Sequence, residues 1–260
     1  MSDGTAFVER IGRVLRCTVS TGDRGSSLHQ DGLQQTVEAI SALRDDDNTG
    51  CLLLVGAGPN FCTGGDVRAF AAAEDIGEYV GAVATSFHTF LLALTEAPVP
   101  VVAAVHGWAA GAGMSIACAA DLVVGGPGTQ LRPAYPALGF SPDGGMSWTL
   151  PRIVGTARAR DILLTDRVLG GREAHELGII AHLVADDAIA EHALELATTL
   201  AEGPTGALGA IKRLLREGQH LELGEHLQAE AASIAERARS AQGREGVRAF
   251  VERRSPRFHD

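Results

Sequence analysis

Short runs of hydrophobic residues in the first half of the chain predict β-strands. The runs cover residues 13–20, 51–55, 99–105 and 122–124, and apolar residues dominate each of them. Because neighbouring positions in these runs are apolar, both faces of each predicted strand would be covered. The pattern therefore indicates a sheet buried between other layers.

Helical periodicity appears between the predicted strands. Asp31 begins a predicted helix that has Leu33, Val37 and Ile40 on one face, and residues 79–94 form a second helical stretch. Strands that alternate with helices are typical of α/β proteins, and we expect that fold class here.

The pattern changes near residue 186, where three apolar stripes with helical spacing follow one another. The stripes are Ala190, Leu194, Ala197 and Ala201; then Leu208, Ile211 and Leu215; then Leu223, Leu227, Ala231, Ile234 and Ala238. No strand pattern follows Gly203. Helices with little sheet to cover predict a part that packs on another surface, such as a second subunit. We therefore divide the chain into a core, residues 1–203, and a helical oligomerisation region, residues 204–260.

Composition narrows the classes of function. The chain has 260 residues, is 45% hydrophobic and has a net charge of −10, with no basic block interleaved with aromatic residues, so we expect no nucleic-acid partner. Its four cysteines lie in separate apolar stretches without CxxC spacing, which predicts buried thiols and no metal site. The first ten residues lack a basic start and an apolar core, so we expect no secretory signal and a cytoplasmic location.

One uncharged stretch, residues 97–120, is long enough to cross a bilayer. Two prolines and three glycines interrupt it, and most of its residues are small. We therefore expect a buried strand followed by a buried helix, and no membrane partner.

Two glycine-rich stretches follow predicted strands, at residues 55–66 and 106–117. Neither is a phosphate loop, because Phe61 replaces the third glycine of GxGxxG in the first and the second has no lysine. If the strands are neighbours, the backbone N–H groups of Gly65 and Ala112 converge, as in an oxyanion hole. Tight packing of strand on helix is the alternative, since glycine serves both purposes.

A lone carboxylate, Asp143, stands in the stretch LGFSPDGGMSW at residues 138–148. A proline precedes it and two glycines follow it. Taken alone, the stretch permits two interpretations: Asp143 caps the helix that follows, or it performs acid–base chemistry.

Four segments, taken in order, resemble the signature of the crotonase, or enoyl-CoA hydratase/isomerase, superfamily. They are FCTGGDV at residues 61–67, PVVAAVHGWAAGAGMSIACAADLVV at 100–124, LGFSPDGGMSWTLPRIVG at 138–155 and HELGIIAHLV at 175–184. The resemblance implies a spiral of ββα turns with C-terminal helices that assemble homotrimers, often paired into hexamers. It also implies an acyl-CoA substrate whose thioester oxygen lies between the Gly65 and Ala112 N–H groups, and an enolate intermediate. It implies no metal or redox cofactor, since coenzyme A is part of the substrate.

The reaction type depends on the residues around that oxyanion hole. Hydratases of the superfamily carry two glutamates, and the resemblance places Ser115 and Tyr135 at these positions, so water addition by the usual route is disfavoured. The resemblance is greatest to the epoxide-ring and enoyl-CoA isomerases of the phenylacetate pathway, in which an aspartate after a proline is the base. The PDGG sequence at residues 142–145 matches that pattern. It predicts Asp143 as the base of a double-bond or ring isomerase.

Three alternatives stay open. The superfamily's 4-chlorobenzoyl-CoA dehalogenase uses an aspartate at the position of Asp143 as a nucleophile, and His88 falls on the place of its histidine. Its tryptophan, however, corresponds to Tyr135. An enoyl-CoA hydratase with an atypical site and a non-catalytic CoA-binding member are the others, given the two missing glutamates.

Further residues are candidates for substrate binding. Those for shaping the acyl pocket are Trp108, Met146 and Trp148, together with Tyr135. Those for contacting coenzyme A are Arg24, Asp66 and Lys212, although the two cations are more typical of an ordinary surface.

Overall fold

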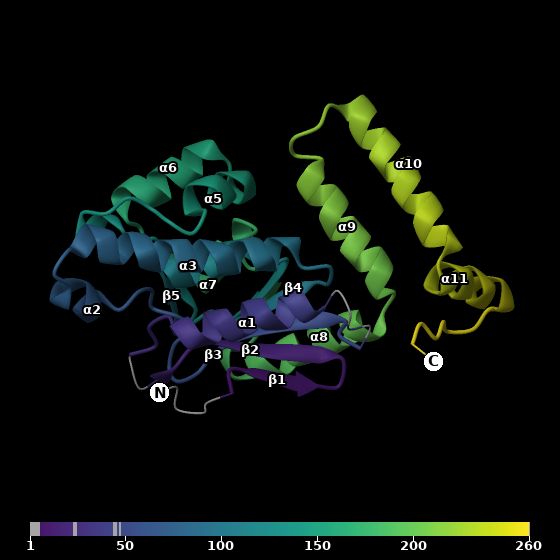
Figure 1. Ribbon diagram of the computed structural model, residues 1–260, viewed down its shortest axis with the longest axis horizontal. Helices are drawn as coiled ribbons and strands as arrows, with labels where there is room; N and C mark the ends of the chain where they lie inside the picture. The colour runs from purple at the N-terminus through teal and green to yellow at the C-terminus, as the bar shows by residue number, and fades with distance from the viewer. Residues whose placement is uncertain (1–5, 23–24, 44–45, 47, 260) are drawn as a thin grey trace.

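The computed structural model describes residues 6–22, 25–43, 46 and 48–259, which form two sheets surrounded by helices (Figure 1). The larger sheet has the strand order β1-β2-β3-β4-β6-β9, and the smaller one has the order β5-β7-β8. The strands of the larger sheet are β1 (Val8–Ile11), β2 (Val14–Ser20), β3 (Cys51–Gly56), β4 (Val101–Val105), β6 (Leu122–Gly125) and β9 (His182–Leu183). Those of the smaller sheet are β5 (Trp108–Ala110), β7 (Gln130–Arg132) and β8 (Leu169–Gly170).

Helices cover both sheets and continue beyond them. Those of the core are α1 (Gln30–Ala42), α2 (Val67–Ala72), α3 (Ile76–Glu96), α4 (Ala112–Ala119), α5 (Met146–Val154), α6 (Thr156–Thr165), α7 (Gly171–Glu176) and α8 (Ile189–Glu202). The C-terminal ones are α9 (Thr205–Glu217), α10 (Leu223–Arg239) and α11 (Ala241–Glu252). The predicted α/β class is confirmed, and so are the four predicted strands and the two predicted helices of the first half, with ends that differ by a few residues.

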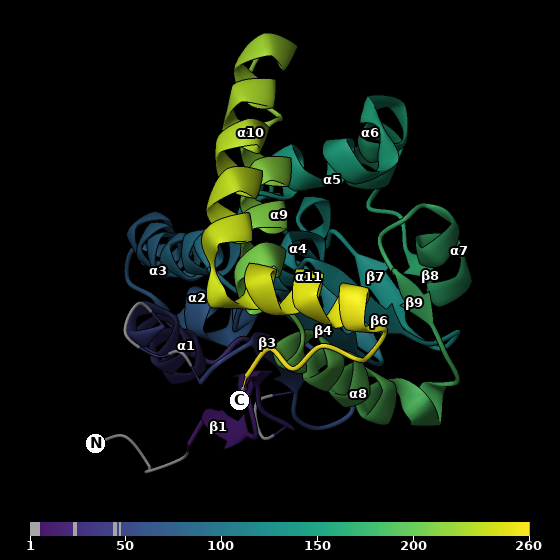
Figure 2. The same cartoon turned by 90° about the vertical axis from the view of Figure 1, so that its right-hand side faces the viewer.

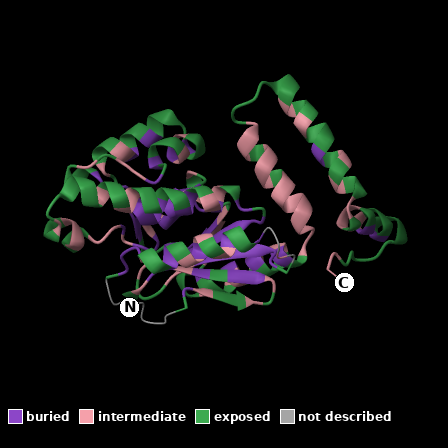
Figure 3. Ribbon diagram, in the orientation of Figure 1, coloured by how far each residue is buried: buried purple, intermediate pink, exposed green. Residues whose placement is uncertain are grey.

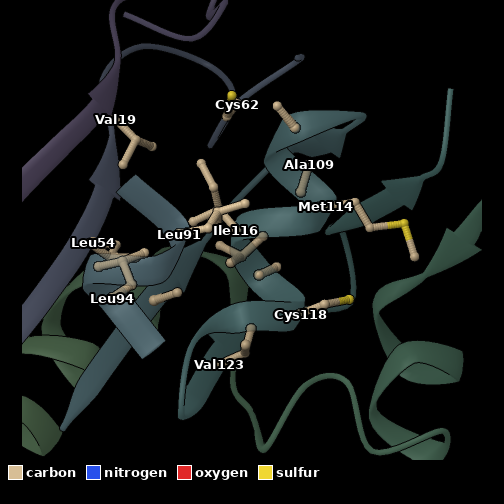
Figure 4. Packing of buried hydrophobic residues seen from close by; sticks show 14 of the residues in the cluster. Val19, Leu54, Cys62, Leu91, Leu94, Ala109, Met114, Ile116, Cys118 and Val123 are labelled. Atoms are coloured by element: carbon tan, nitrogen blue, oxygen red, sulfur yellow. The ribbon is translucent and has the colours of Figure 1, made fainter. Parts of the chain in front are cut away.

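The central strands of the larger sheet are buried on both faces, as their apolar runs predict. Along β3, Leu52 and Leu54 point into the cluster formed with α1, α3 and α4. The alternate residues Cys51 and Leu53 point into a second cluster formed with α8. Figure 4 shows the first cluster, in which Leu54, Leu94 and Ile116 pack together. This alternation follows from the two-residue period of a strand.

The uncharged stretch at residues 97–120 folds as β4, β5 and α4, which confirms the predicted strand followed by a helix and adds a short strand between them. Every residue of β4 is buried. Across the described residues, no helix has both the length and the hydropathy needed to cross a membrane.

Helices α10 and α11 extend away from the core (Figures 1 and 2), whereas α9 is bound to it through Lys212 and Arg216. Much of α10 is exposed (Figure 3), and its stripe residue Ile234 is 72% exposed. Phe250 of α11, a helix that the stripes do not predict, is 85% exposed. The predicted stripe on α8 is partly wrong: Ala190 is exposed, because the helix turns Ile189 toward the sheet instead.

Candidate active site

Two glycine-rich loops meet beyond the carboxyl ends of β3 and β4. These strands are parallel neighbours, and Cys62 in the first loop pairs with Ala109 in a parallel bridge. In the bridge, the Ala110 N–H donates to the Cys62 carbonyl oxygen at 2.9 Å. The segments that carry Gly65 and Ala112 are thereby held side by side.

The N–H groups of Gly65 and Ala112 are free to meet a ligand. Both residues line one cavity. Ala112 is the first residue of α4, so its N–H has no acceptor within the helix. Neither N–H donates a hydrogen bond to any residue that the structure describes. Close packing also operates here, since a Cβ on Gly113 would collide with the Cys62 carbonyl group.

The cavity has a volume of about 680 Å³ and a largely apolar wall. One side is an apolar face of α3, made by Val80, Val83, Ala84 and Phe87. Sequence reasoning missed these residues, because an apolar helix face has the same spacing whether it meets a ligand or the core. The opposite side is the segment from Ala134 to Asp143.

The Asp143 carboxylate belongs to this wall and contacts a tyrosine. The Tyr135 O–H donates to Asp143 Oδ1 at 2.7 Å. Helix α5 begins after Gly145 and has no side-chain cap. The interpretation of Asp143 as a helix cap is therefore wrong, because its carboxylate bonds to Tyr135.

Glycine is required beside Asp143. Gly144 has a φ of +60°, in the left-handed region that favours glycine. A Cβ on Gly144 would also lie 2.9 Å from Ser115 Cβ and would collide with the Phe87 ring. The Gly144 N–H donates to His88 Nε2 at 3.2 Å. His88, Ser115 and Tyr135, which the resemblance places at catalytic positions of other family members and makes possible auxiliary residues here, thus all lie around Asp143.

The electrostatics of this cluster keep Tyr135 protonated. Burial, and then the negative charge of Asp143, raise the pKa of Tyr135 above its usual range. Its hydroxyl oxygen lies 3.2 Å from Ser115 Oγ. Since Tyr135 donates its only proton to Asp143, it is the acceptor for Ser115.

The structure does not place the other candidate pocket residues on the cavity wall. Met146 is fully buried, while Trp108 is 38% exposed. Trp148 is also exposed, and its ring stacks on the guanidinium of Arg152, whose carbon lies 3.8 Å from the ring centroid. All three lie outside the residues that line the cavity.

The candidates for contacting coenzyme A have other partners. Arg24 lies outside the described residues. Asp66 caps α2 by accepting N–H groups from its first turn. The ammonium group of Lys212 pairs with Asp121 at 2.8 Å and donates to the Leu94 carbonyl at 2.8 Å. Burial lowers the pKa of Lys212, an effect that Asp121 opposes.

A cavity with two free N–H donors and a carboxylate is typical of enzymes that stabilise an oxyanion. The family model described as enoyl-CoA hydratase/isomerase matches residues 13–260, and the chain belongs to this crotonase family of enzymes.

Relatives within the family catalyse different reactions. The chain is 36% identical over 250 residues to 1,2-epoxyphenylacetyl-CoA isomerase from Escherichia coli K12, covering 94% of both chains. It is 32% identical to 4-chlorobenzoyl coenzyme A dehalogenase-2 from an Arthrobacter species, covering 84% of this chain and 79% of the relative. A crystal structure of an enoyl-CoA hydratase from Polaromonas sp. JS666 superposes with a TM-score of 0.91 at 29% identity, covering 97% of this chain and 98% of that one. The family and the crotonase fold are therefore established.

Proposed function

We propose that the protein is an enoyl-CoA isomerase in which Asp143 is the only base. The observation that carries the proposal is the composition of one cavity wall, which holds the Asp143 carboxylate together with Gly65 and Ala112. An acyl-CoA thioester placed there has its oxygen between the two N–H groups and its acidic carbons beside the carboxylate. The acyl-CoA substrate is in keeping with the family.

In the proposed reaction, Asp143 removes a proton from the saturated carbon adjacent to the thioester carbonyl. The electron pair of the broken C–H bond moves toward the thioester oxygen, and the Gly65 and Ala112 N–H groups stabilise the enolate oxygen. The protonated Asp143 then returns the proton to a different carbon, which shifts the double bond. No metal or redox group is needed, because the N–H groups carry the developing charge.

Ser115 and Tyr135 support isomerisation over hydration. At the positions where the resemblance places glutamates in hydratases, this chain has two hydroxyl groups that bond to each other at 3.2 Å. Burial raises the pKa of Tyr135, so its phenol does not act as a base at neutral pH.

Two observations favour a substrate whose acyl group contains a ring. The aromatic side chains of Phe70, Phe87 and Phe140 line the cavity. The Escherichia coli relative is named for an epoxyphenylacetyl group. We expect a higher kcat/KM for ring-bearing acyl-CoA substrates than for straight chains with the same number of carbons.

The experiment that tests the base is Asp143→Asn. We expect it to reduce both isomerisation of 3-enoyl-CoA substrates and exchange of α-protons into D₂O by about 10² to 10⁴-fold. Asp161→Asn is the matched control, because Asp161 is a half-exposed carboxylate on α6 that pairs with Arg167. If Asp143→Asn leaves every substrate and the exchange unaffected, the proposal is wrong.

Two other outcomes would identify a different function. Release of chloride from 4-chlorobenzoyl-CoA would indicate a dehalogenase. One contact argues against that function: His88 Nε2 already accepts the Gly144 N–H, so this nitrogen is not free to activate water. Binding of acyl-CoA without any proton exchange would indicate a non-catalytic member.

We also propose that residues 204–260 assemble the chain into a homotrimer or a pair of trimers. The support is the exposed apolar surface of α9, α10 and α11, which one chain leaves uncovered. Apolar surface of this extent is typical of an interface.

A further inference from the structure

The proposed base has two carboxylate oxygens in different environments. Asp143 Oδ1 accepts the Tyr135 O–H at 2.7 Å. Asp143 Oδ2 has no hydrogen-bond partner among the described residues, although Asp143 lines the cavity. A lone pair on Oδ2 is therefore available to a substrate, whereas Oδ1 is occupied.

Tyr135 is held independently of Asp143. The backbone just before it is anchored by Asp166, which accepts the Ala134 N–H at 2.7 Å and pairs with the Arg132 guanidinium at 2.5 Å. Tyr135 itself is only 8% exposed. Its hydroxyl therefore reaches Asp143 from a buried side chain on an anchored segment of backbone.

The direction of this hydrogen bond is also fixed. Burial and the charge of Asp143 raise the pKa of Tyr135, so the phenol keeps its proton and donates it. Ser115, which is fully buried, bonds to the same phenol oxygen and lies 3.4 Å from the Asp143 carbonyl oxygen. Two titratable side chains bond to the loop that carries Asp143, namely Tyr135 and, from α3, His88. From α4, among the described residues, the Ser115 hydroxyl faces the same loop.

We propose that Tyr135 is a positioning residue that holds Asp143 by Oδ1, so that Oδ2 alone removes the substrate proton and returns it. This inference rests on the proposed function of Asp143. When Oδ2 gains the proton, Tyr135 still donates to Oδ1 and opposes rotation of the carboxyl group. The proton therefore stays on Oδ2, facing the substrate, until Asp143 returns it.

Tyr135→Phe tests the inference, because it removes the hydroxyl and keeps the ring. Because hydrogen bonds to charged groups are among the stronger ones in proteins, we expect kcat to fall about tenfold or more while KM stays unchanged. With a deuterated substrate in H₂O, the fraction of deuterium returned to the product should fall.

Controls separate positioning from folding. Tyr79→Phe is the matched control, because it removes a hydroxyl from a 41% exposed tyrosine of α3 outside the residues that line the cavity, and it should leave kcat and the deuterium return unchanged. Denaturant unfolding of Tyr135→Phe measures the fraction that is folded under assay conditions, so that kcat is expressed per folded enzyme.

The failure of this inference differs from the failure of the proposed function. If Asp143→Asn abolishes proton exchange but Tyr135→Phe keeps the wild-type kcat and deuterium return, then Tyr135 does not position the base. If Asp143→Asn keeps wild-type exchange, the proposed base itself is wrong, and this inference is overturned with it.

Discussion

The ring of Phe70 occupies the space into which a side chain on Gly65 would project. A Cβ on Gly65 would lie 2.5 Å from Phe70 Cζ, far inside the usual contact distance. Phe70 also packs against Phe140, with ring centroids 6.5 Å apart. One aromatic side chain thus joins the proposed oxyanion loop to the loop that carries Asp143.

Gly65→Ala is expected to displace the Gly65 N–H and to reduce kcat/KM by about 10² to 10³-fold, the usual effect of losing an oxyanion donor. Steady-state kinetics with an enoyl-CoA substrate measures the loss. The double variant Gly65→Ala/Phe70→Leu should recover part of the activity, because the smaller side chain makes room for the methyl group. An unchanged kcat/KM for Gly65→Ala would contradict the assignment of this donor.

Gly144→Ala and Gly145→Ala form a matched pair. Both glycines have a positive φ, but a Cβ on Gly144 would collide with neighbours, whereas a Cβ on Gly145 has nothing within 4 Å. We expect Gly145→Ala to lower the free energy of unfolding by about 1–2 kcal/mol from backbone strain alone. Gly144→Ala should lower the free energy of unfolding by about 1–3 kcal/mol more than that, because of overpacking, and should also displace Asp143. Denaturant unfolding and kinetics check both; equal effects would argue against the described packing.

The cysteines should be unreactive in the folded protein. Burial raises the pKa of Cys17, Cys51, Cys62 and Cys118 to about 12. Because the thiolate is the reactive form, a thiol reagent at pH 8 should label none of them until denaturant is added. Rapid labelling of the native protein would show that at least one of these thiols is exposed.

Glu245 should make the C-terminal segment sensitive to acid. Its carboxylate bonds to the guanidinium groups of Arg248 and Arg254, which hold the pKa of Glu245 well below its usual range. A depressed carboxyl pKa stabilises the fold above the usual value, and this contribution is lost as the pH falls. Glu245→Gln should therefore lower Tm at pH 7 and differ less from wild type at pH 3. Glu252→Gln, which changes a half-exposed carboxylate, is the control and should have a small effect at both values.

A charge on the exposed face of α10 should disrupt the proposed oligomer. We expect Ile234→Asp to shift the molar mass from three or six chains toward one, as measured by light scattering after size-exclusion chromatography. Gln228→Asp, at an exposed polar position of the same helix, should leave the mass unchanged. A wild-type protein that is a monomer would overturn the proposal.

The local sequence pattern predicts those helices and strands whose structure depends mainly on residues close together in the chain. The consecutive apolar residues of β3 and β4 allow only a buried strand, and both strands are where the sequence predicts them. The rotation of α8 depends on the sheet beneath it, so Ala190 was placed on the wrong face. The apolar stripes do not predict α11, because Glu245 and Arg248 interrupt its apolar spacing.

The candidate site, too, could be predicted from the sequence only in part. The resemblance brought Asp143, Tyr135 and Ser115 to one region, but their hydrogen bonds join residues 8 and 20 positions apart and depend on the fold. Trp148 was expected at the substrate because it follows Asp143 closely, yet α5 turns its ring outward onto Arg152. The wall on α3 has no sequence signal that distinguishes it from core.

The bridge between Cys62 and Ala109 joins the two glycine-rich loops to each other just beyond β3 and β4, the neighbouring buried strands that they follow. Because each loop directly continues one of these strands, we expect the loops to unfold together with the core. Loss of activity on heating should therefore coincide with global melting, without an earlier inactivation phase. The half-life of activity at high temperature is then set by the rate at which the whole core unfolds.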